Sequence, residues 1–193
     1  MKKIMFNDRY GLTQAVIEGR KTMTRRVISG YPLLPDDRIE DARICPDGFV
    51  SIIANRGESL MEVKYHYKAG EVVAVAQNYS SFYNILDNTR PIPEGAGWEN
   101  KMFVRADLMP HQIRITRIKY ERLQDISDAD CLKEGIRYFP KINKFYFEDI
   151  RREEGFYFDN HREAFAALID KVSGRGTWER NPWVVAYEFD LLK

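Results

Sequence analysis

The chain contains little cysteine and little histidine, which narrows the chemistry open to it. Two cysteines, Cys45 and Cys131, and three histidines, His66, His111 and His161, occur among 193 residues. Neither a His-x3-His motif nor a cysteine pair at metal-ligand spacing joins them, so we expect no metal and no cofactor. We interpret both cysteines as free thiols of a reducing compartment.

Net charge and long apolar runs are also lacking. The 30 Lys and Arg residues face 29 Asp and Glu residues, which leaves a net charge of +1. This balance argues against non-specific coating of nucleic acid, so any such contact must be local. No apolar run approaches the roughly 20 residues of a membrane span, and the N-terminus lacks the apolar region of a signal peptide. We therefore expect a cytoplasmic protein with no membrane partner, and the oligomeric state stays open.

The composition that remains is typical of one folded domain. Hydrophobic residues make up 44% of the chain and charged residues 31%, which fits a globular protein and not a disordered tail. No Gly/Ser-rich linker or shift in composition divides the sequence. We predict a single domain over residues 1–193.

Apolar spacing predicts three helices in this domain. Gly19 is a natural stop for the first, and Ser127 and Asn160 are N-cap residues for the second and third. The predicted helices cover residues 8–18, 127–134 and 160–172.

Several segments read as strands. The continuous apolar run 72–76 predicts a strand buried on both faces, which we expect at the centre of the sheet. In residues 112–122 the apolar positions change phase, which predicts a β-bulge near Thr116. The other predicted strands are residues 22–28 and a last strand containing Val185, Tyr187, Phe189 and Leu191, with hairpin strands at 49–54 and 60–65.

The segment 78–107 is rich in turn residues and also carries aromatic side chains, Tyr79, Phe82, Tyr83 and Trp98. A connection of this length is usually functional or disordered, and the aromatics favour order. They either stack on a nucleic-acid base or pack as an Ω-loop on the sheet. We favour packing.

The segment from Gly19 to Arg26 concentrates four cations and two hydroxyls within eight residues, just after the first helix. The plain interpretation is a solvated, cationic edge strand that deters strand pairing. The alternative is a binding site in which the cations contact phosphates. A second cationic group occurs in residues 111–122. The candidate nucleic-acid contacts are Arg20, Lys21, Arg25, Arg26 and Arg114.

This segment and three that follow it resemble the ASCH domain family of the PUA-like superfamily. The resemblance runs nearly end to end and is closest to larger ASCH-like proteins of bacteriophages and mobile elements, whose function is largely unassigned. It implies an α+β fold, a PUA-like mixed β-barrel with flanking helices and extended loops. The matching segments are residues 19–26, 67–75, 123–136 and 181–189.

The resemblance also implies a chemistry. In small ASCH-fold amidohydrolases that deacetylate acetylcytidine, the positions matching Lys21, Thr24 and Glu134 act as base, nucleophile and proton donor. An ideal strand would place Lys21 and Thr24 on opposite faces, so their convergence requires a turn or a bulge just after Gly19. Glu134 would lie in the last turn of a helix, where the dipole disfavours an anion, so we expect a cation beside it.

Three functions stay open at this stage. The first is binding of RNA or a modified nucleotide or nucleoside in a basic cleft, where Arg20, Lys21, Arg25 and Arg26 would lie together with Glu134. The second is an amidohydrolase that acts on an acylated pyrimidine nucleoside, which requires a concave pocket where the three catalytic candidates converge. The third is a protein–protein interaction module, which requires an apolar surface patch.

Overall fold

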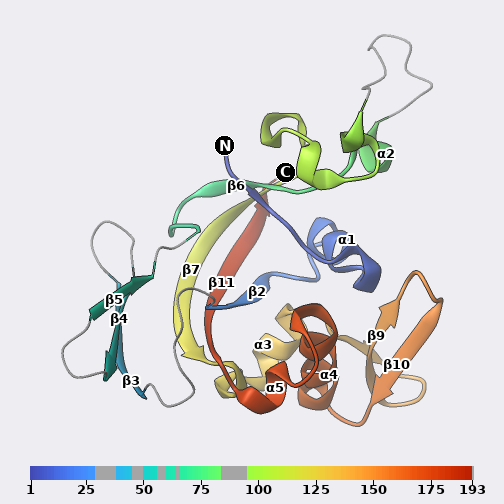
Figure 1. The fold of residues 1–193 in the computed structure, drawn as a ribbon. Helices are drawn as coiled ribbons and strands as arrows, with labels where there is room; N and C mark the ends of the chain where they lie inside the picture. Colours follow the sequence, from blue (N-terminus) through green and yellow to red (C-terminus); the bar gives the residue numbers. More distant parts are fainter. Residues whose placement is uncertain (29–37, 45–49, 56–59, 64–65, 84–94, 193) are drawn as a thin grey trace.

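The computed structural model (Figure 1) describes residues 1–28, 38–44, 50–55, 60–63, 66–83 and 95–192, which form an α+β fold. Its main sheet has five strands in the order β1-β6-β7-β11-β2. β1 pairs with β6 in parallel, and the other neighbours are antiparallel. Within the described residues the sheet is open, because no pairing joins β1 to β2. The strands are β1 (Lys3–Ile4), β2 (Met23–Val27), β6 (Val72–Val75), β7 (Gln112–Arg122) and β11 (Trp183–Leu192).

The apolar run at 72–76 is buried on both faces, as predicted, but it is not the central strand. Val73 and Val75 of β6 pack in the main core, while Ala74 and Ala76 pack in a second cluster with Val104 and Met109. The central strand is β7, which pairs with β11 from Arg122 opposite Trp183 to Gln112 opposite Leu192. The predicted central position is wrong because strand order depends on pairings between segments that are distant along the chain.

The predicted bulge is confirmed. Glu188 of β11 lies opposite Arg117, while the next residue, Phe189, lies opposite Ile115, so Thr116 is the extra residue of β7. The bulge lets Ile115 point into the core, where it is fully buried.

The helices predicted over 127–134 and 160–172 are confirmed to within one residue at each end, and the first predicted helix is not continuous. Ser127 accepts a hydrogen bond at the start of α3 (Asp128–Lys133), and Asn160 does so for α4 (His161–Ser173). The single helix predicted over 8–18 is wrong, because Gly11 adopts a left-handed φ of 64°. It separates the turn η1 (Asp8–Tyr10) from α1 (Leu12–Ile17).

The core lies between the main sheet and the helices α1 and α4, and Figure 1 shows α3, α4 and α5 (Thr177–Arg180) gathered beside one end of that sheet. Phe165 and Leu168 of α4 pack in the same cluster as Leu12 of α1 and Phe189 of β11. Burial of such side chains stabilises the fold by about 1.5–3 kcal/mol each.

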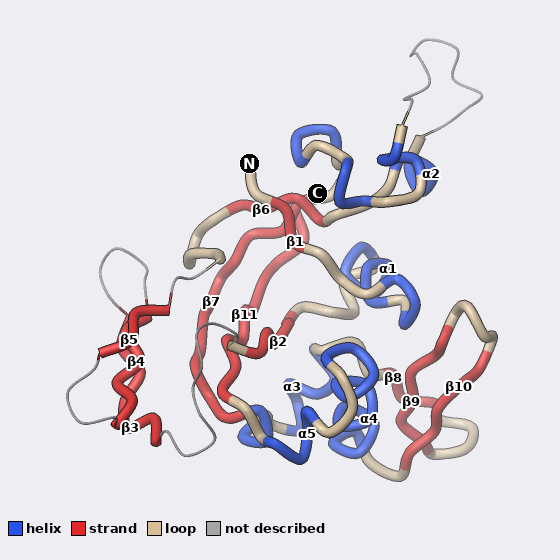
Figure 2. The backbone as a smooth tube through the Cα atoms, in the orientation of Figure 1, coloured by secondary structure: helices blue, strands red, loops and turns tan. Residues whose placement is uncertain are grey.

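Two three-stranded antiparallel sheets complete the architecture, as the tube in Figure 2 shows. One is made of β8 (Arg137–Phe139), β9 (Lys144–Asp149) and β10 (Glu154–Phe158), and its Phe147 joins the core. The other contains the predicted hairpin strands as β4 (Val50–Asn55) and β5 (Leu60–Val63), preceded by β3 (Arg38–Ile44). Cys45 lies outside the described residues.

The aromatic segment after β6 packs, as favoured, where the structure describes it. Tyr79 and Phe82, both on α2 (Tyr79–Phe82), lie against a small apolar cluster that includes Ala76 and Met109. Residues 84–94 lie outside the described chain. The rest of the segment forms three short turns, η2 (Ala96–Trp98), η3 (Lys101–Phe103) and η4 (Ala106–Leu108).

Gly135 provides a test of how tightly α3 is joined to the rest of the fold. It has a φ of +105°, and a Cβ there would lie 3.2 Å from Leu12 and 3.7 Å from the Lys21 side chain. We expect Gly135→Ala to lower the free energy of unfolding by about 1–3 kcal/mol, measured by urea denaturation. Gly174→Ala is the matched control, because its φ is +102° but nothing lies within 4 Å. Equal losses in the two variants would show that the contacts around Gly135 contribute nothing.

Candidate active site

A turn after α1 sets the position of Lys21. Gly19 takes a left-handed φ of 72°, and the backbone N–H groups of Arg20 and Lys21 both donate to the Ala15 carbonyl. The N–H of Thr22 then donates to the Lys133 carbonyl at 2.9 Å, which joins this turn to the end of α3. β2 begins only at Met23. The turn required after Gly19 is therefore present, and Lys21 does not follow strand alternation.

Lys21 and Glu134 form a buried ion pair. The Lys21 Nζ lies 2.6 Å from Glu134 Oε2 and also donates to the Glu134 carbonyl oxygen at 2.7 Å. The two residues are only 2% and 4% exposed. Glu134 is the C-cap of α3, so its charge lies at the end of the helix that disfavours an anion. The expected cation beside it is present.

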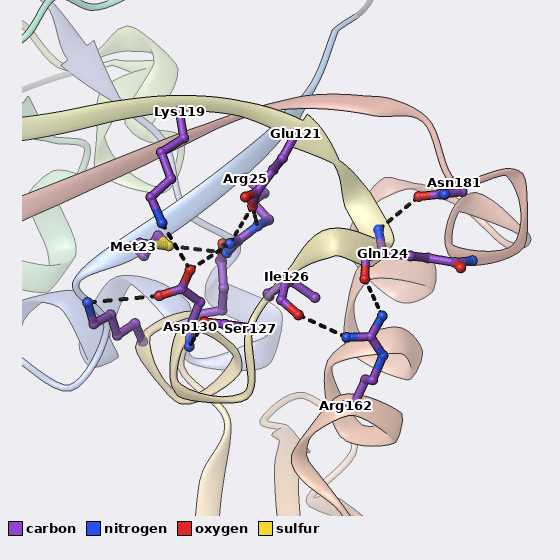
Figure 3. A network of polar contacts seen from close by, with 12 residues as sticks. Met23, Arg25, Lys119, Glu121, Gln124, Ile126, Ser127, Asp130, Arg162 and Asn181 are labelled. Atoms are coloured by element: carbon purple, nitrogen blue, oxygen red, sulfur yellow. Dashed lines mark hydrogen bonds and ion pairs between the residues drawn. The ribbon is translucent and has the colours of Figure 1, made fainter.

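Arg25 connects Glu134 to two further carboxylates, Glu121 and Asp130, and Figure 3 shows Arg25 with these two. Its NH1 donates to Glu134 Oε1 at 3.1 Å, its Nε to Glu121 Oε1 at 2.8 Å, and its NH2 to Asp130 Oδ2 at 3.1 Å. The Arg25 side chain is fully buried, so this part of β2 is no solvated cationic edge. Glu121 and Asp130 were not among the site residues predicted from the sequence. The available signal was that Arg25 shares strand parity with the apolar residues Met23 and Val27.

Lys21, Thr24 and Glu134 line one cavity of about 460 Å³. Arg25 and Arg26 line it as well, and Thr24 is 5% exposed. No other described residue forms a hydrogen bond with the Thr24 hydroxyl. Most of the remaining lining is apolar, and the Phe6 ring lies 5.9 Å from the Lys21 Nζ. The apolar residues are Phe6, Leu12, Phe165, Leu168, Ile169 and Val172.

The remaining cationic candidates fall in different places. Arg26 lines the cavity and donates to the Met5 carbonyl. Arg20 does not line it: its guanidinium lies 2.5 Å from Glu18 at the surface, because the turn that sends Lys21 inward sends Arg20 outward. Arg114 is exposed on β7, opposite Asp190. The expectation of one shared cleft therefore holds for Lys21, Arg25 and Arg26 and is wrong for Arg20.

Burial sets the protonation chemistry of the cavity. Loss of solvation lowers the pKa of Lys21 below the ordinary lysine value. Glu134 opposes that change, while the charges of Arg26 and Arg25 add to it. A buried lysine of this kind gives up its proton more readily than a surface lysine and can act as a base.

Other chemistries have less support in the described residues. Cys131 is a buried free thiol whose pKa burial raises to about 11, which makes it a poor nucleophile. No group of three or more His, Cys, Asp or Glu side chains is placed there to hold a metal ion. None of the helices described is both long and apolar enough to span a membrane.

Comparison of the chain with protein-family models, with curated proteins and with solved structures found no match.

The lowered pKa of Lys21 has a consequence for stability. At a pH between the lowered pKa of Lys21 in the folded protein and its ordinary pKa in the unfolded chain, the unfolded chain binds more protons. The free energy of unfolding therefore rises with pH through this range. The rise is complete above the unfolded-state pKa of about 10.4. We expect the difference in free energy of unfolding between wild type and Lys21→Met to rise with pH in this range.

Lys133→Met is the control, because the pH dependence expected for Lys133 has the opposite sign. The hydrogen bond to Glu188 raises the pKa of Lys133 in the folded protein. Lys133 therefore contributes fully to stability below its unfolded-state pKa, and the contribution is lost as pH rises through its folded-state pKa. Denaturation curves from pH 6 to the onset of alkaline unfolding measure both. A flat difference for Lys21→Met would show that Lys21 keeps its proton as an ordinary surface lysine does.

Proposed function

We propose that the cavity binds an acylated pyrimidine nucleoside and hydrolyses its amide. The observation that carries the proposal is that Lys21, Thr24 and Glu134 line one cavity. These residue types supply a hydroxyl nucleophile, an amine base and a carboxylate that orients the base. The resemblance to ASCH-fold amidohydrolases supports the choice of substrate.

In the first step the neutral Lys21 amine accepts the proton of the Thr24 hydroxyl as the oxygen attacks the acyl carbon. The carbon becomes tetrahedral, and its oxygen carries the negative charge. Arg26, which lines the same cavity, is a cation that stabilises this charge. The lowered pKa of Lys21 is what makes its amine available for this step.

The structure favours a role for Glu134 that differs from proton donation. Its two carboxylate oxygens accept hydrogen bonds from Lys21 and Arg25, so neither is free to carry a proton to the substrate. We assign Glu134 to holding the Lys21 amine in place. The ammonium formed on Lys21 then gives its proton to the leaving amine as the carbon–nitrogen bond breaks.

The acyl group is left as an ester of Thr24. Water attacks this ester, with Lys21 again taking the proton, and a carboxylic acid leaves as the threonine hydroxyl re-forms. The apolar lining, with Leu168 and Val172 of α4, provides a surface for a pyrimidine ring and its acyl group. A cavity of about 460 Å³ is within the usual range for small-molecule sites.

The same proposal relates the fold to the PUA-like barrel. The curved five-stranded sheet, the bulge at Thr116 and the helix ending at Glu134 support this relation.

A second candidate function is the reading of single-stranded RNA, because the cavity adjoins an open trough. Both are lined by Lys3, His66 and Tyr67, and the trough measures about 750 Å³. The trough is also lined by Met102 and Phe103, which are 61% and 64% exposed. An exposed aromatic ring beside a cationic cavity favours stacking of a neighbouring base.

Turnover of acylated cytidines tests the first proposal. We expect wild type to release the acid and free cytidine, and Lys21→Ala to reduce kcat/KM by about 10²–10⁴-fold, the usual worth of a general base. Thr24→Val should abolish turnover, while Thr24→Ser retains it. Arg114→Gln is the control, because Arg114 is exposed and does not line the cavity. No hydrolysis by wild type would leave the cavity a binding site only.

The RNA candidate has a separate test in the binding of short single-stranded oligonucleotides. Phe103→Ala should weaken binding by about 1–3 kcal/mol if a base stacks on its ring, as measured by fluorescence anisotropy. Leu108→Ala is matched to it, since Leu108 is 49% exposed but does not line the trough. Equal affinities in the two variants would remove stacking at Phe103 from consideration.

A further inference from the structure

We infer that Arg25 is a positioning residue that shares the charge of Glu134 and thereby leaves Lys21 free to exchange its proton. The inference rests on the proposed function for its purpose. Its physical basis is the arrangement of charges on four elements around the buried Lys21.

The Glu134 carboxylate is divided between two cations. Oε2 faces the Lys21 amine and Oε1 faces Arg25 NH1, so each cation holds one oxygen. A lysine that alone faced a buried carboxylate would be held in its charged form, because the two charges stabilise each other. Arg25 reduces that effect by competing for the same anion.

Arg25 is fixed so that it can compete. Its Nε and NH2 both bind Glu121 on β7, and its NH2 also binds Asp130 on α3. The Arg25 side chain is fully buried. Guanidinium geometry allows these contacts at once, which a lysine at this position would not allow. Arg25 keeps its charge at any pH where the protein is folded.

Within the described residues, the charges that act on Lys21 are those of one carboxylate, Glu134, and two cations, Arg26 and Arg25. The two cations oppose a proton on Lys21 and the carboxylate favours it. Lys3 and His66 line the same cavity. Ion pairs extend the cluster to Glu121 and Lys119 on β7, Asp130 and Lys133 on α3, and Glu188 on β11.

The inference predicts opposite changes from two substitutions. Arg25→Gln removes a nearby positive charge and the cation that holds Glu134 Oε1, so the pKa of Lys21 should rise, by about one pH unit for the loss of a like charge at close range. In Glu121→Gln the charge of Arg25 is less compensated, so Arg25 acts more strongly on Glu134 and the pKa of Lys21 should fall. Arg25→Lys should lie between wild type and Arg25→Gln.

The measurement is an NMR titration of the Lys21 side chain in the full chain labelled with isotopic lysine and assigned with Lys21→Met. The titration needs no substrate. If the pKa of Lys21 changes as predicted in the variants but wild type hydrolyses no acylated cytidine, the proposed function is overturned and this inference stands. If wild type is active, the pH at which kcat/KM rises should shift with the pKa of Lys21. Arg20→Gln is the control for loss of one positive charge, because Arg20 lies at the surface against Glu18.

An unchanged Lys21 pKa in folded Arg25→Gln would overturn the inference. If Arg25→Gln does not fold, Glu121→Gln decides, since Glu121 is partly exposed and the variant keeps Arg25 and its contact with Glu134. A Lys21 pKa that rises or stays constant in Glu121→Gln would show that Arg25 has only a structural role.

Discussion

The buried contact between Lys21 and Glu134 is the constraint on which the site depends. It joins the turn after α1 to the end of α3, two segments more than a hundred residues apart, at 2.6 Å. Neighbouring backbone bonds support the same joint, from Lys21 to Ala15 and from Thr22 to Lys133. Because both side chains are buried, removing one partner leaves an uncompensated charge, which typically destabilises a protein by about 3–5 kcal/mol. The residues that build the site therefore also hold the helices to the sheet.

Burial of so many charges is an unusual use of a protein interior, and a hydrophobic cluster of equal volume would often be as stable or more so. Arg25 is wholly buried among three carboxylates, although β2 is an edge strand. Such an arrangement is reasonable where a buried lysine must hold its proton weakly and its carboxylate must stay charged. The Lys21 side chain is only 2% exposed, so solvent contributes little to holding the charge of its amine.

Sequence reasoning found the local features and missed those that depend on distant pairing. Ser127, Gly19 and the bulge at Thr116 follow from short-range rules on caps, turns and periodicity, and all three are present. The strands β8 to β10 were not predicted, and the turns joining them contain Asn143 and Glu153 with positive φ, the second a residue that gives no turn signal. Lys21, Thr24 and Glu134 were predicted from the resemblance. The role of Arg25 could not be predicted from the sequence, because it depends on β7 and α3 bringing their carboxylates next to β2.

The central claim is that Lys21 and Thr24 act as one chemical unit, and a double-mutant cycle in hydrolysis of acetylcytidine tests it most directly. Residues that act on the same step are not additive, because removing either one already abolishes the step they share. We predict that kcat/KM of Lys21→Ala/Thr24→Ala equals that of the worse single variant. Losses that multiply in the double variant would show that the two side chains act independently and would contradict the account.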